Sequence, residues 1–276
     1  MCSFFKLSLV TLDKSYIKPL KVMLLSLKAT NVDCRFSIWL LHDSIPEAEI
    51  NHLRGFTDKL DYDFHPLKID ATYWQTAPTL KQYPTEMYYR LLCTEYLPAD
   101  LERIIYLDPD TLILNPIEAL WSIDLKGNMI AAASHLGLTG INQTINNVRL
   151  RTKSEYFNSG VMLLDLNKMR AKVNKSDILD LIKDHAKELV LPDQDILNYL
   201  YGNQILSIPE EIWNFDTRAN IVHFAKSRGQ VDTNWVIANT SILHFCGRPK
   251  PWDKHSINRF TILYQHYQRI LELNYN

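Results

Sequence analysis

The amino-acid sequence predicts an α/β protein with a mostly parallel, mixed sheet flanked by helices. Short runs rich in β-branched and aromatic residues, such as Arg103–Leu107, alternate with longer segments of helical periodicity. This alternation of strands and helices is typical of a parallel sheet. The length of 276 residues fits one large domain, and no internal repeat, low-complexity run or linker divides it. We therefore expect a single domain over residues 1–276.

Each expected element has a local reason in the sequence. The strands are short apolar runs bounded by polar, glycine or proline residues. The helices repeat apolar residues on one face; Pro19 lies in a first turn, where its missing N–H is harmless, and Gly202 closes a helix. In chain order the expected strands are Leu7–Leu12, Arg35–His42, Tyr62–Ile69, Arg103–Leu107, Met129–Ser134, Phe157–Leu166 and Thr240–Leu243. The expected helices are Tyr16–Ala29, Pro46–Phe56, Thr85–Tyr96, a short one from Asn115 to Trp121, one capped by Ser176 that runs to about Leu189, Asp193–Tyr201 and Ile257–Leu273.

Two carboxylates, Asp108 and Asp110, directly follow the strand Arg103–Leu107. Pro109 favours extended geometry at the residue before it, so both side chains are expected to point the same way. Two like charges at the end of a buried strand need a cation between them or a raised pKa. A divalent metal that carries a phosphate is the simpler solution. The alternative is an Asx-Pro turn with solvated acids.

A second segment with candidate ligands, His244–Trp252, follows the strand Thr240–Leu243. An imidazole can complete a metal site held by two carboxylates. Gly247 lets backbone approach a ligand closely, and Lys250 supplies a point charge suited to phosphate. Each residue alone has a common structural explanation. Together they form the string H-x-x-G-x-x-K-P-W, which is rare by chance and favours a metal-bound phosphate.

Composition and charge argue against a nucleic-acid partner. The formal net charge is −1 at pH 7, with an ordinary hydrophobic content of 46%. No apolar run reaches the length of a membrane span, although peripheral contact with a membrane remains open. The apolar N-terminus is interpreted as a first strand rather than as a signal peptide. The cysteines are widely spaced without a C-x-x-C pair, which indicates thiols in a reducing compartment, so we expect a cytoplasmic protein.

Four motifs follow one another along the chain. They are a D-x-D strand at Tyr106–Leu112, a Y-F-N-[AS]-G-V strand at Tyr156–Val161, a D-Q-D-x-L-N helix start at Asp193–Asn198 and the string His244–Trp252. In this order they resemble the retaining glycosyltransferase family eight, which includes bacterial galactosyl- and glucosyltransferases and, more distantly, glycogenins. The resemblance covers residues 6–255 and implies a Rossmann-like GT-A fold, followed by a C-terminal helix over residues 256–276.

The resemblance implies a UDP-sugar donor and a Mn²⁺ cofactor, with Mg²⁺ as the alternative. Asp108, Asp110 and His244 are the implied metal ligands, a set whose added imidazole favours Mn²⁺. Gly247 and Lys250 are the implied diphosphate contacts. The residues implied to contact the nucleotide-sugar as a whole are Asp13, Ser15, Arg90, Asp108, Pro109, Asn158, Asp193, Gly247 and Lys250.

The transferred sugar is implied to lie among Asn158, Asp193 and Gln194, with Gln194 and Asp193 as the catalytic residues. Two departures from the family leave the donor sugar open between glucose and galactose. Ser15 stands where the similar galactosyltransferases have Asn, and His135 stands where they have Asp. Structural alternatives remain for two more residues in this set: Asp13 as a helix-capping residue and Arg90 as a surface residue of its helix.

The implied function is transfer of a hexose to a glycan or other acceptor, in cell-surface glycan biosynthesis, with retained anomeric configuration. Gln194 is a poor nucleophile, so a front-side route is favoured over double displacement; its carbonyl dipole would stabilise positive charge on the sugar. The polar region His135–Glu155 is expected to form a lid. Alternatives are a sugar-nucleotide-binding partner subunit without turnover and a metal-dependent phosphohydrolase or nucleotidyltransferase. The acceptor, the linkage and the oligomeric state stay open.

Overall fold

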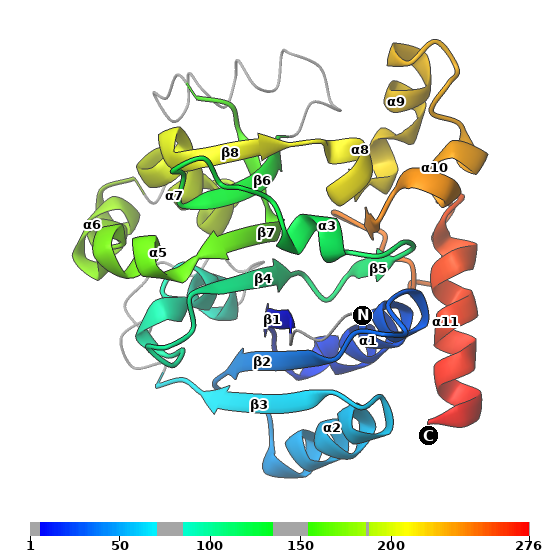
Figure 1. Ribbon diagram of the computed structural model, residues 1–276, viewed down its shortest axis with the longest axis horizontal. Coiled ribbons are helices and arrows are strands. Elements are labelled where there is room, and N and C mark those ends of the chain that lie inside the picture. Colours follow the sequence, from blue (N-terminus) through cyan, green and yellow to red (C-terminus); the bar gives the residue numbers. More distant parts are fainter. Residues whose placement is uncertain (1–5, 71–84, 135–153, 186–187, 276) are drawn as a thin grey trace.

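The computed structural model of the chain describes residues 6–70, 85–134, 154–185 and 188–275. Its centre is a seven-stranded sheet with the order β3-β2-β1-β4-β7-β6-β8 (Figure 1). The strands are β1 (Lys6–Thr11), β2 (Phe36–His42), β3 (Asp63–Lys68), β4 (Arg103–Leu107), β6 (Ile130–Ser134), β7 (Phe157–Asp165) and β8 (Ile205–Ile208). Pairing is parallel from β3 through β2 and β1 to β4, and again between β6 and β8. The expected mostly parallel, mixed sheet is therefore confirmed.

Strand β7 runs antiparallel to both of its neighbours, β4 and β6. The carboxyl end of β4 consequently meets the amino end of β7, with Leu107 opposite Val161. One residue further on, the Asp108 N–H donates to the Gly160 carbonyl at 2.7 Å. The D-x-D motif and the Y-F-N-S-G-V motif thus lie side by side, although about fifty residues separate them in the chain.

A small second sheet brings the C-terminal histidine to the same place. It has the order β5-β10-β9, formed by β5 (Thr111–Ile113), β10 (Ile242–His244) and β9 (Phe215–Asp216). Strand β5 begins directly after Asp110, and its first residue, Thr111, pairs with His244. The strand expected at Thr240–Leu243 therefore starts later and includes His244, and this register sets the imidazole beside the aspartates.

The large sheet is covered on both faces. Successive residues of one strand belong to different core clusters, because their side chains point to opposite faces. Ile105 belongs to the cluster that includes residues of α1, α2 and α11. Tyr106 belongs to the cluster that includes residues of the segment after residue 85 and of α5 to α7. The helices are α1 (Ile17–Thr30), α2 (Glu47–Lys59), α3 (Glu118–Trp121), α5 (Leu166–Lys172), α6 (Lys175–His185), α7 (Pro192–Tyr201), α8 (Glu210–Trp213), α9 (Asn220–Lys226), α10 (Thr233–Asn239) and α11 (Thr261–Asn274).

Several expected elements differ in the structure. The helix expected at Thr85–Tyr96 is instead two 3₁₀ segments, Thr85–Arg90 and Cys93–Glu95. Residues 88 to 93 are all buried, whereas a regular α-helix at the surface buries one face, so this segment runs through the core. The cap of α6 comes from Asn174, whose Oδ1 accepts from the backbone N–H and the hydroxyl of Ser176.

The remaining differences concern element ends and a loop. Helix α6 ends at His185, before the expected end near Leu189. The terminal helix begins at Thr261 rather than Ile257, which is 95% exposed. Residues 135–153 of the expected lid lie outside the described residues.

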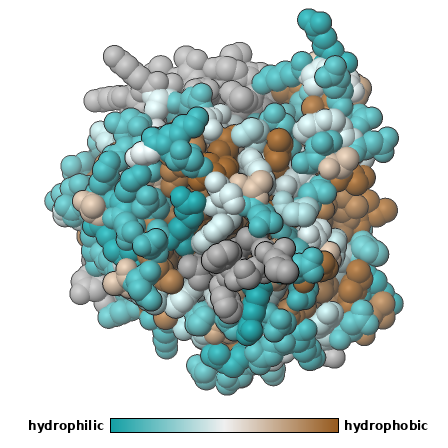
Figure 2. All heavy atoms as spheres, viewed as in Figure 1, coloured by the Kyte–Doolittle hydropathy of each residue, from teal (hydrophilic) through white to brown (hydrophobic). Residues whose placement is uncertain are grey.

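The surface is mostly polar in the view of Figure 2, and apolar residues gather at the edge where α11 runs. Helix α11 carries the exposed side chains of Ile262 and Leu273. Among the described residues, no helix has both the length and the apolar character needed to cross a bilayer.

Candidate active site

Three side chains converge where β4, β5 and β10 meet. One ligand atom from each of Asp108, Asp110 and His244 lies within 4.8 Å of the others. The Nε2 atom of His244 is 3.3 Å from Asp110 Oδ1 and 3.8 Å from Asp108 Oδ2. Two carboxylate oxygens and one imidazole nitrogen form a donor set that fits a divalent metal ion, because each supplies a lone pair to one central point. The cluster can therefore hold a metal, and we call these three residues the metal cluster.

The two aspartates meet through a turn, and the expectation of an extended Asp108-Pro109-Asp110 segment was wrong. The backbone N–H of Thr111 donates to the Asp108 carbonyl at 3.2 Å, and its hydroxyl donates to the same oxygen at 2.8 Å. This is a β-turn with proline in its second position, a place that suits the fixed φ of proline. Asp110 and Pro109 are buried in this turn, so it is not a turn of solvated acids.

Asp110 is the most enclosed acid of the cluster, with 6% exposure. The Lys250 ammonium lies on its Oδ2 atom and also donates to the Phe245 carbonyl at 2.9 Å. Burial favours a protonated Asp110, but the positive charges of His244 and Lys250 outweigh it and hold the pKa of this carboxyl below its ordinary value. The carboxylate is thus ready to accept a cation at neutral pH. Lys250, the expected diphosphate contact, pairs with this carboxylate in the structure.

The other nitrogen of His244 is held by Asn214. His244 Nδ1 lies 2.9 Å from Asn214 Oδ1, and Asn214 Nδ2 donates to Asn158 Oδ1 at 2.7 Å. Asn158 Nδ2 in turn donates to Gln194 Oε1 at 3.0 Å. Asn158, Gln194 and Asn214, which we call the amide cluster, are each at most 6% exposed. The metal ligands and the expected sugar residues are therefore parts of one connected site.

Gln194 is fixed by two donors to its carbonyl oxygen. Besides Asn158, the backbone N–H of Ser159 donates to Gln194 Oε1 at 3.3 Å. Its Nε2 atom is buried and has no hydrogen-bond partner among the described residues. A buried N–H₂ group without a partner is costly, so a ligand oxygen beside it would satisfy it. Gln194 is placed to face a polar ligand, with an orientation set before the ligand arrives.

Helix α7 holds Asp193 and Gln194 through the other residues of its motif. Asp195 accepts from the backbone N–H groups of Val190 and Leu191 and from the Tyr156 hydroxyl at 2.6 Å. The Asn198 side chain pairs with both backbone groups of Phe157 at 2.7 and 2.8 Å. The second aspartate and the asparagine of D-Q-D-x-L-N therefore attach α7 to β7.

Arg90 lies between the two halves of the site. Its guanidinium is 3.0 Å from Asp108 Oδ1 and 3.3 Å from Asp193 Oδ2, and it lies over the ring of Tyr106. It is 7% exposed, which excludes the alternative of a surface residue. Burial raises the pKa of Asp193, and the Arg90 charge opposes this rise. Arg90 thus pairs with the buried Asp193 and the partly buried Asp108, and the Ser159 hydroxyl adds a hydrogen bond to Asp193 at 3.0 Å.

Replacing Arg90 by Met should destabilise the fold by about 3–5 kcal/mol, because it leaves the buried Asp193 and the partly buried Asp108 without their cation. Burial already raises the pKa of Asp193, and losing Arg90 would raise it further. The folded variant would then bind a proton more readily than the unfolded chain, so its stability should fall as pH rises through the neutral range. Urea unfolding at pH 5.5 and 8 measures this.

Arg35→Met is the matched control for that variant. The Arg35 pair with Asp63 is half exposed, at 50% and 33%, so its loss should cost less than about 1 kcal/mol. Equal effects of the two substitutions would contradict the bridging role of Arg90.

The N-terminal candidates lie at the end of β1. Asp13 Oδ1 accepts from the backbone N–H and the hydroxyl of Ser15, both at 2.6 Å, and caps a short 3₁₀ turn. The capping alternative thus describes the local geometry of Asp13. Tyr16, which follows, packs edge-on against Trp252 with ring centroids 5.8 Å apart. Asp13 and Ser15 are therefore next to the His244–Trp252 segment, but no hydrogen bond links them to the metal cluster.

Gly247 has a backbone conformation that favours glycine. Its φ is +69°, and an added Cβ would lie 2.6 Å from Nη1 of Arg218. The expected permissive role of this glycine agrees with the geometry. Trp252 packs between Tyr16 and Tyr264 of α11, which agrees with a packing role for the tryptophan.

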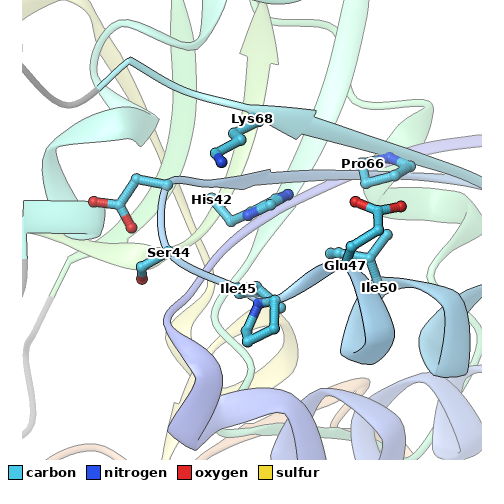
Figure 3. A pocket seen from close by; sticks show the side chains of 9 residues that line it. His42, Ser44, Ile45, Glu47, Ile50, Pro66 and Lys68 are labelled. Carbon is cyan, nitrogen blue, oxygen red and sulfur yellow. The ribbon is translucent and has the colours of Figure 1, made fainter.

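A separate hollow of about 410 Å³ lies at the ends of β2 and β3, beside the start of α2 (Figure 3). His42, Glu47 and Lys68 are among its lining residues. None of the expected site residues lines it. Its link to the active site is indirect. Tyr89, the residue before Arg90 in the sequence, donates its hydroxyl to Asp43 of this hollow at 3.0 Å.

Some site residues were missed by reading the sequence. Tyr106 donates to Asp108 Oδ1 at 2.7 Å and lies 3.1 Å from the Thr11 hydroxyl. Its position two residues before Asp108, on the same side of a strand, was an available signal. Ser159 lies inside the quoted motif and was not assigned a role. Asn214 has no sequence signal, because nothing around it repeats a known ligand pattern.

Comparison with known proteins places the chain in a family. The model of the family described as "Glycosyl transferase family 8" matches residues 8–256. General stress protein A of Bacillus subtilis is 27% identical over 269 residues, which cover 95% of this chain and 92% of that protein. Glycosyltransferase GlyF of Streptococcus pneumoniae is 25% identical, and the match covers 93% of this chain but 59% of GlyF. Lipopolysaccharide 1,2-glucosyltransferase of Escherichia coli is 24% identical, with 87% and 71% covered.

The fold also matches solved structures. The galactosyltransferase LgtC, crystallised with donor and acceptor sugar analogues, has a TM-score of 0.82 and 22% identity, with 96% of this chain and 95% of that chain covered. The structure of GlyE from Streptococcus pneumoniae has a TM-score of 0.72, with 96% of this chain and 60% of that chain covered. These likenesses confirm the GT-A fold. The family match over nearly the whole chain, together with a cluster in its motifs that can hold a metal, shows that this protein belongs to glycosyl transferase family 8 and is a glycosyltransferase.

Proposed function

We propose that the chain transfers a hexose, glucose or galactose, from a UDP-sugar to a hydroxyl group of a glycan or glycoconjugate, with retained anomeric configuration. The observation that carries this proposal is the connection of the metal cluster to the amide cluster through His244 and Asn214. A nucleotide-sugar has an anionic diphosphate at one end and a hydroxyl-rich ring at the other. The two parts of the site match these two ends.

The metal cluster is proposed to bind Mn²⁺, with Mg²⁺ as the alternative, because its imidazole ligand favours Mn²⁺ over Mg²⁺. When bound, the ion would neutralise charge on the diphosphate leaving group. Lys250 and Gly247 lie in the segment after His244 and are proposed to contact the same diphosphate. Pro109 and Arg90 are also proposed to contact the nucleotide-sugar, and they hold Asp108 in its turn and in its ion pair.

The proposed reaction breaks the bond between the anomeric carbon and the terminal phosphate oxygen of UDP. A new bond forms between that carbon and the acceptor oxygen, on the same face. The acceptor proton passes to the departing phosphate oxygen, so UDP and the glycoside are the products. The Gln194 carbonyl oxygen, implied by the resemblance to face the sugar, accepts from Asn158 and Ser159, whereas Nε2 has no partner among the described residues. Gln194 is therefore proposed to act through Nε2, on the negative charge that develops on the departing phosphate oxygen, and Asp193, buried beside it, to bind the sugar hydroxyls.

Gln194→Ala should lower kcat about a hundredfold and leave the affinity for the donor nearly unchanged. The Gln194 dipole is held by Asn158 and Ser159 and acts on charge that exists only in the transition state. Initial rates over a range of donor concentrations separate kcat from KM, and UDP calorimetry reports donor binding. Gln230→Ala, at an exposed glutamine, is the control. Full activity of Gln194→Ala would show that the sugar lies elsewhere.

A screen of UDP-sugars tests the proposed function. The protein with Mn²⁺ should release UDP slowly from one UDP-hexose without an acceptor, and chelation should stop the release. Release of UMP or inorganic phosphate would instead indicate a phosphohydrolase or nucleotidyltransferase. Binding of a UDP-sugar with no turnover, even with glycan acceptors present, would favour a partner subunit without activity.

A further inference from the structure

We propose that Asn214 is a positioning residue that prepares both halves of the site, by fixing which nitrogen of His244 carries a proton and by holding in place the Asn158 amide that contacts Gln194. The tests of this proposal measure the His244 hydrogen bond and the affinity for metal, and neither depends on the proposed UDP-sugar donor. Asn214 lies between α8 and β9 and is 1% exposed. Its backbone N–H donates to the Glu210 carbonyl at 3.0 Å, so its position is set by the end of α8.

The direction of the hydrogen bonds is fixed by backbone groups. The Gly160 N–H donates to Asn158 Oδ1 at 2.8 Å, and the Ser159 N–H donates to Gln194 Oε1 at 3.3 Å. A backbone N–H can only donate, so both side-chain atoms must be oxygens. Asn158 therefore presents its oxygen to Asn214 and its nitrogen to Gln194.

This direction determines the state of the imidazole. Asn214 must place its Nδ2 toward Asn158 Oδ1, which leaves its Oδ1 facing His244 Nδ1 at 2.9 Å. A carbonyl oxygen can only accept, so Nδ1 of His244 carries the proton. In the neutral ring Nε2 then has a free lone pair, on the side of Asp108 and Asp110. A partner on the second ring nitrogen commonly orients a metal-binding histidine in this way.

Burial protects this arrangement from water. His244 is 3% exposed and Asn158 is 6% exposed, so water has little access to replace Asn214 on either side. One amide group thus serves two neighbours with its two ends. Its oxygen prepares the imidazole for a metal, and its nitrogen holds Asn158 in the orientation that fixes Gln194.

Two substitutions separate these two tasks. Asn214→Asp keeps an oxygen for the His244 Nδ1 proton but places a second oxygen against Asn158 Oδ1, so it should disturb only the sugar half. Asn214→Ala removes both interactions. We expect Mn²⁺ affinity to stay within about threefold of the parent in Asn214→Asp and to fall 10- to 100-fold in Asn214→Ala.

Three readouts test this. Electron paramagnetic resonance titration with Mn²⁺ gives the affinity. The ¹⁵N shifts of His244 in the metal-free protein, recorded at an alkaline pH where the ring is neutral, should show Nδ1–H in the parent and in Asn214→Asp, and a mixture of tautomers in Asn214→Ala. The rate of UDP release should fall in both variants, about a hundredfold in Asn214→Asp. Failure of UDP release in the parent would count against the proposed function and leave the first two readouts intact.

Asn31→Ala is the matched control for losing a buried asparagine. Asn31 is 4% exposed and hydrogen-bonds to Leu27 and Ile117, which belong to neither half of the site. It should lower the melting temperature and leave Mn²⁺ affinity and the His244 tautomer unchanged. If Asn214→Ala lowers the melting temperature but keeps parental Mn²⁺ affinity and the Nδ1–H tautomer, Asn214 is only structural and the proposal fails. A Mn²⁺ affinity in Asn214→Asp as low as in Asn214→Ala would also overturn it.

Discussion

The Asp110→Asn variant is expected to lose about a thousandfold or more in kcat/KM and to bind UDP equally weakly with and without Mn²⁺. Asp110 offers one carboxylate oxygen to the metal cluster and is ionised at neutral pH, since His244 and Lys250 lower the pKa of its carboxyl. An amide keeps the shape but removes the charge. The size of the expected loss follows from the several kcal/mol by which a metal stabilises the negative charge that develops on the phosphate in the transition state. About 1.4 kcal/mol corresponds to a tenfold change in rate.

Calorimetry with UDP in Mn²⁺, without metal and after chelation is the measurement. His244→Ala should behave similarly, and it leaves the Lys250 contact with Asp110 in place, so agreement of the two variants points to the metal rather than to that contact. Asp58→Asn, at an exposed carboxylate on α2, is the control. Equal UDP affinity of the parent protein in all three conditions would remove the metal from the proposal.

Gly160→Ala is expected to abolish metal binding while the sheet stays folded. An added Cβ would lie 2.2 Å from Cε1 of His244, 2.7 Å from Asp108 Oδ2 and 3.0 Å from Asn158 Oδ1. None of these three side chains can move away freely, because each is held by hydrogen bonds or ion pairs. The methyl group must therefore displace the imidazole or the carboxylate.

We expect Mn²⁺ affinity to fall at least about a hundredfold in Gly160→Ala. This is more than the roughly 10- to 100-fold loss that typically follows when a residue hydrogen-bonded to a metal ligand is mutated. Far-ultraviolet circular dichroism should remain that of the parent, because strand β7 keeps its backbone pairing. Gly55→Ala is a matched control in α2, where no atom lies within 4 Å of the added Cβ; it should leave metal binding unchanged and raise stability by up to about 1 kcal/mol. Parental Mn²⁺ affinity in Gly160→Ala would mean that the metal does not use His244 and Asp108 together.

The residues that the sequence correctly predicted to lie together are those in local motifs. Asp108, Asp110 and His244 each end an apolar run, and strand ends of an α/β sheet gather at one edge. The amide cluster was only partly predictable. Asn158 and Gln194 belong to motifs. Asn214 instead reaches the site because strand β9, which begins at the next residue, pairs with β10 and so lies beside His244. Such a register depends on tertiary packing that a single sequence does not display.

The fold was predictable where elements are long and periodic. The strands β1 to β4 and the helices α1 and α2 fall close to their expected positions. The region from β8 to α10 was missed, because its elements are two to seven residues long and carry too little pattern to recognise. The turn after β4 was misjudged for a related reason. The sequence around Pro109 allows both extended and turn geometry, and the Thr111 hydrogen bonds to Asp108 decide between them.

The contact between Lys250 and Asp110 makes the ammonium and a metal ion competitors for one carboxylate. Lys250 lies on Oδ2 of Asp110, whereas Oδ1 faces His244. A divalent ion on Oδ1 would therefore meet a carboxylate whose charge Lys250 already partly neutralises, which weakens the affinity for the ion alone. A diphosphate on the same ion would attract the ammonium and offset this repulsion. By thermodynamic linkage, each ligand would strengthen the binding of the other by the same factor. The site would therefore take up metal and nucleotide together more readily than either alone, so that the protein selects the metal complex of its donor over the free ion.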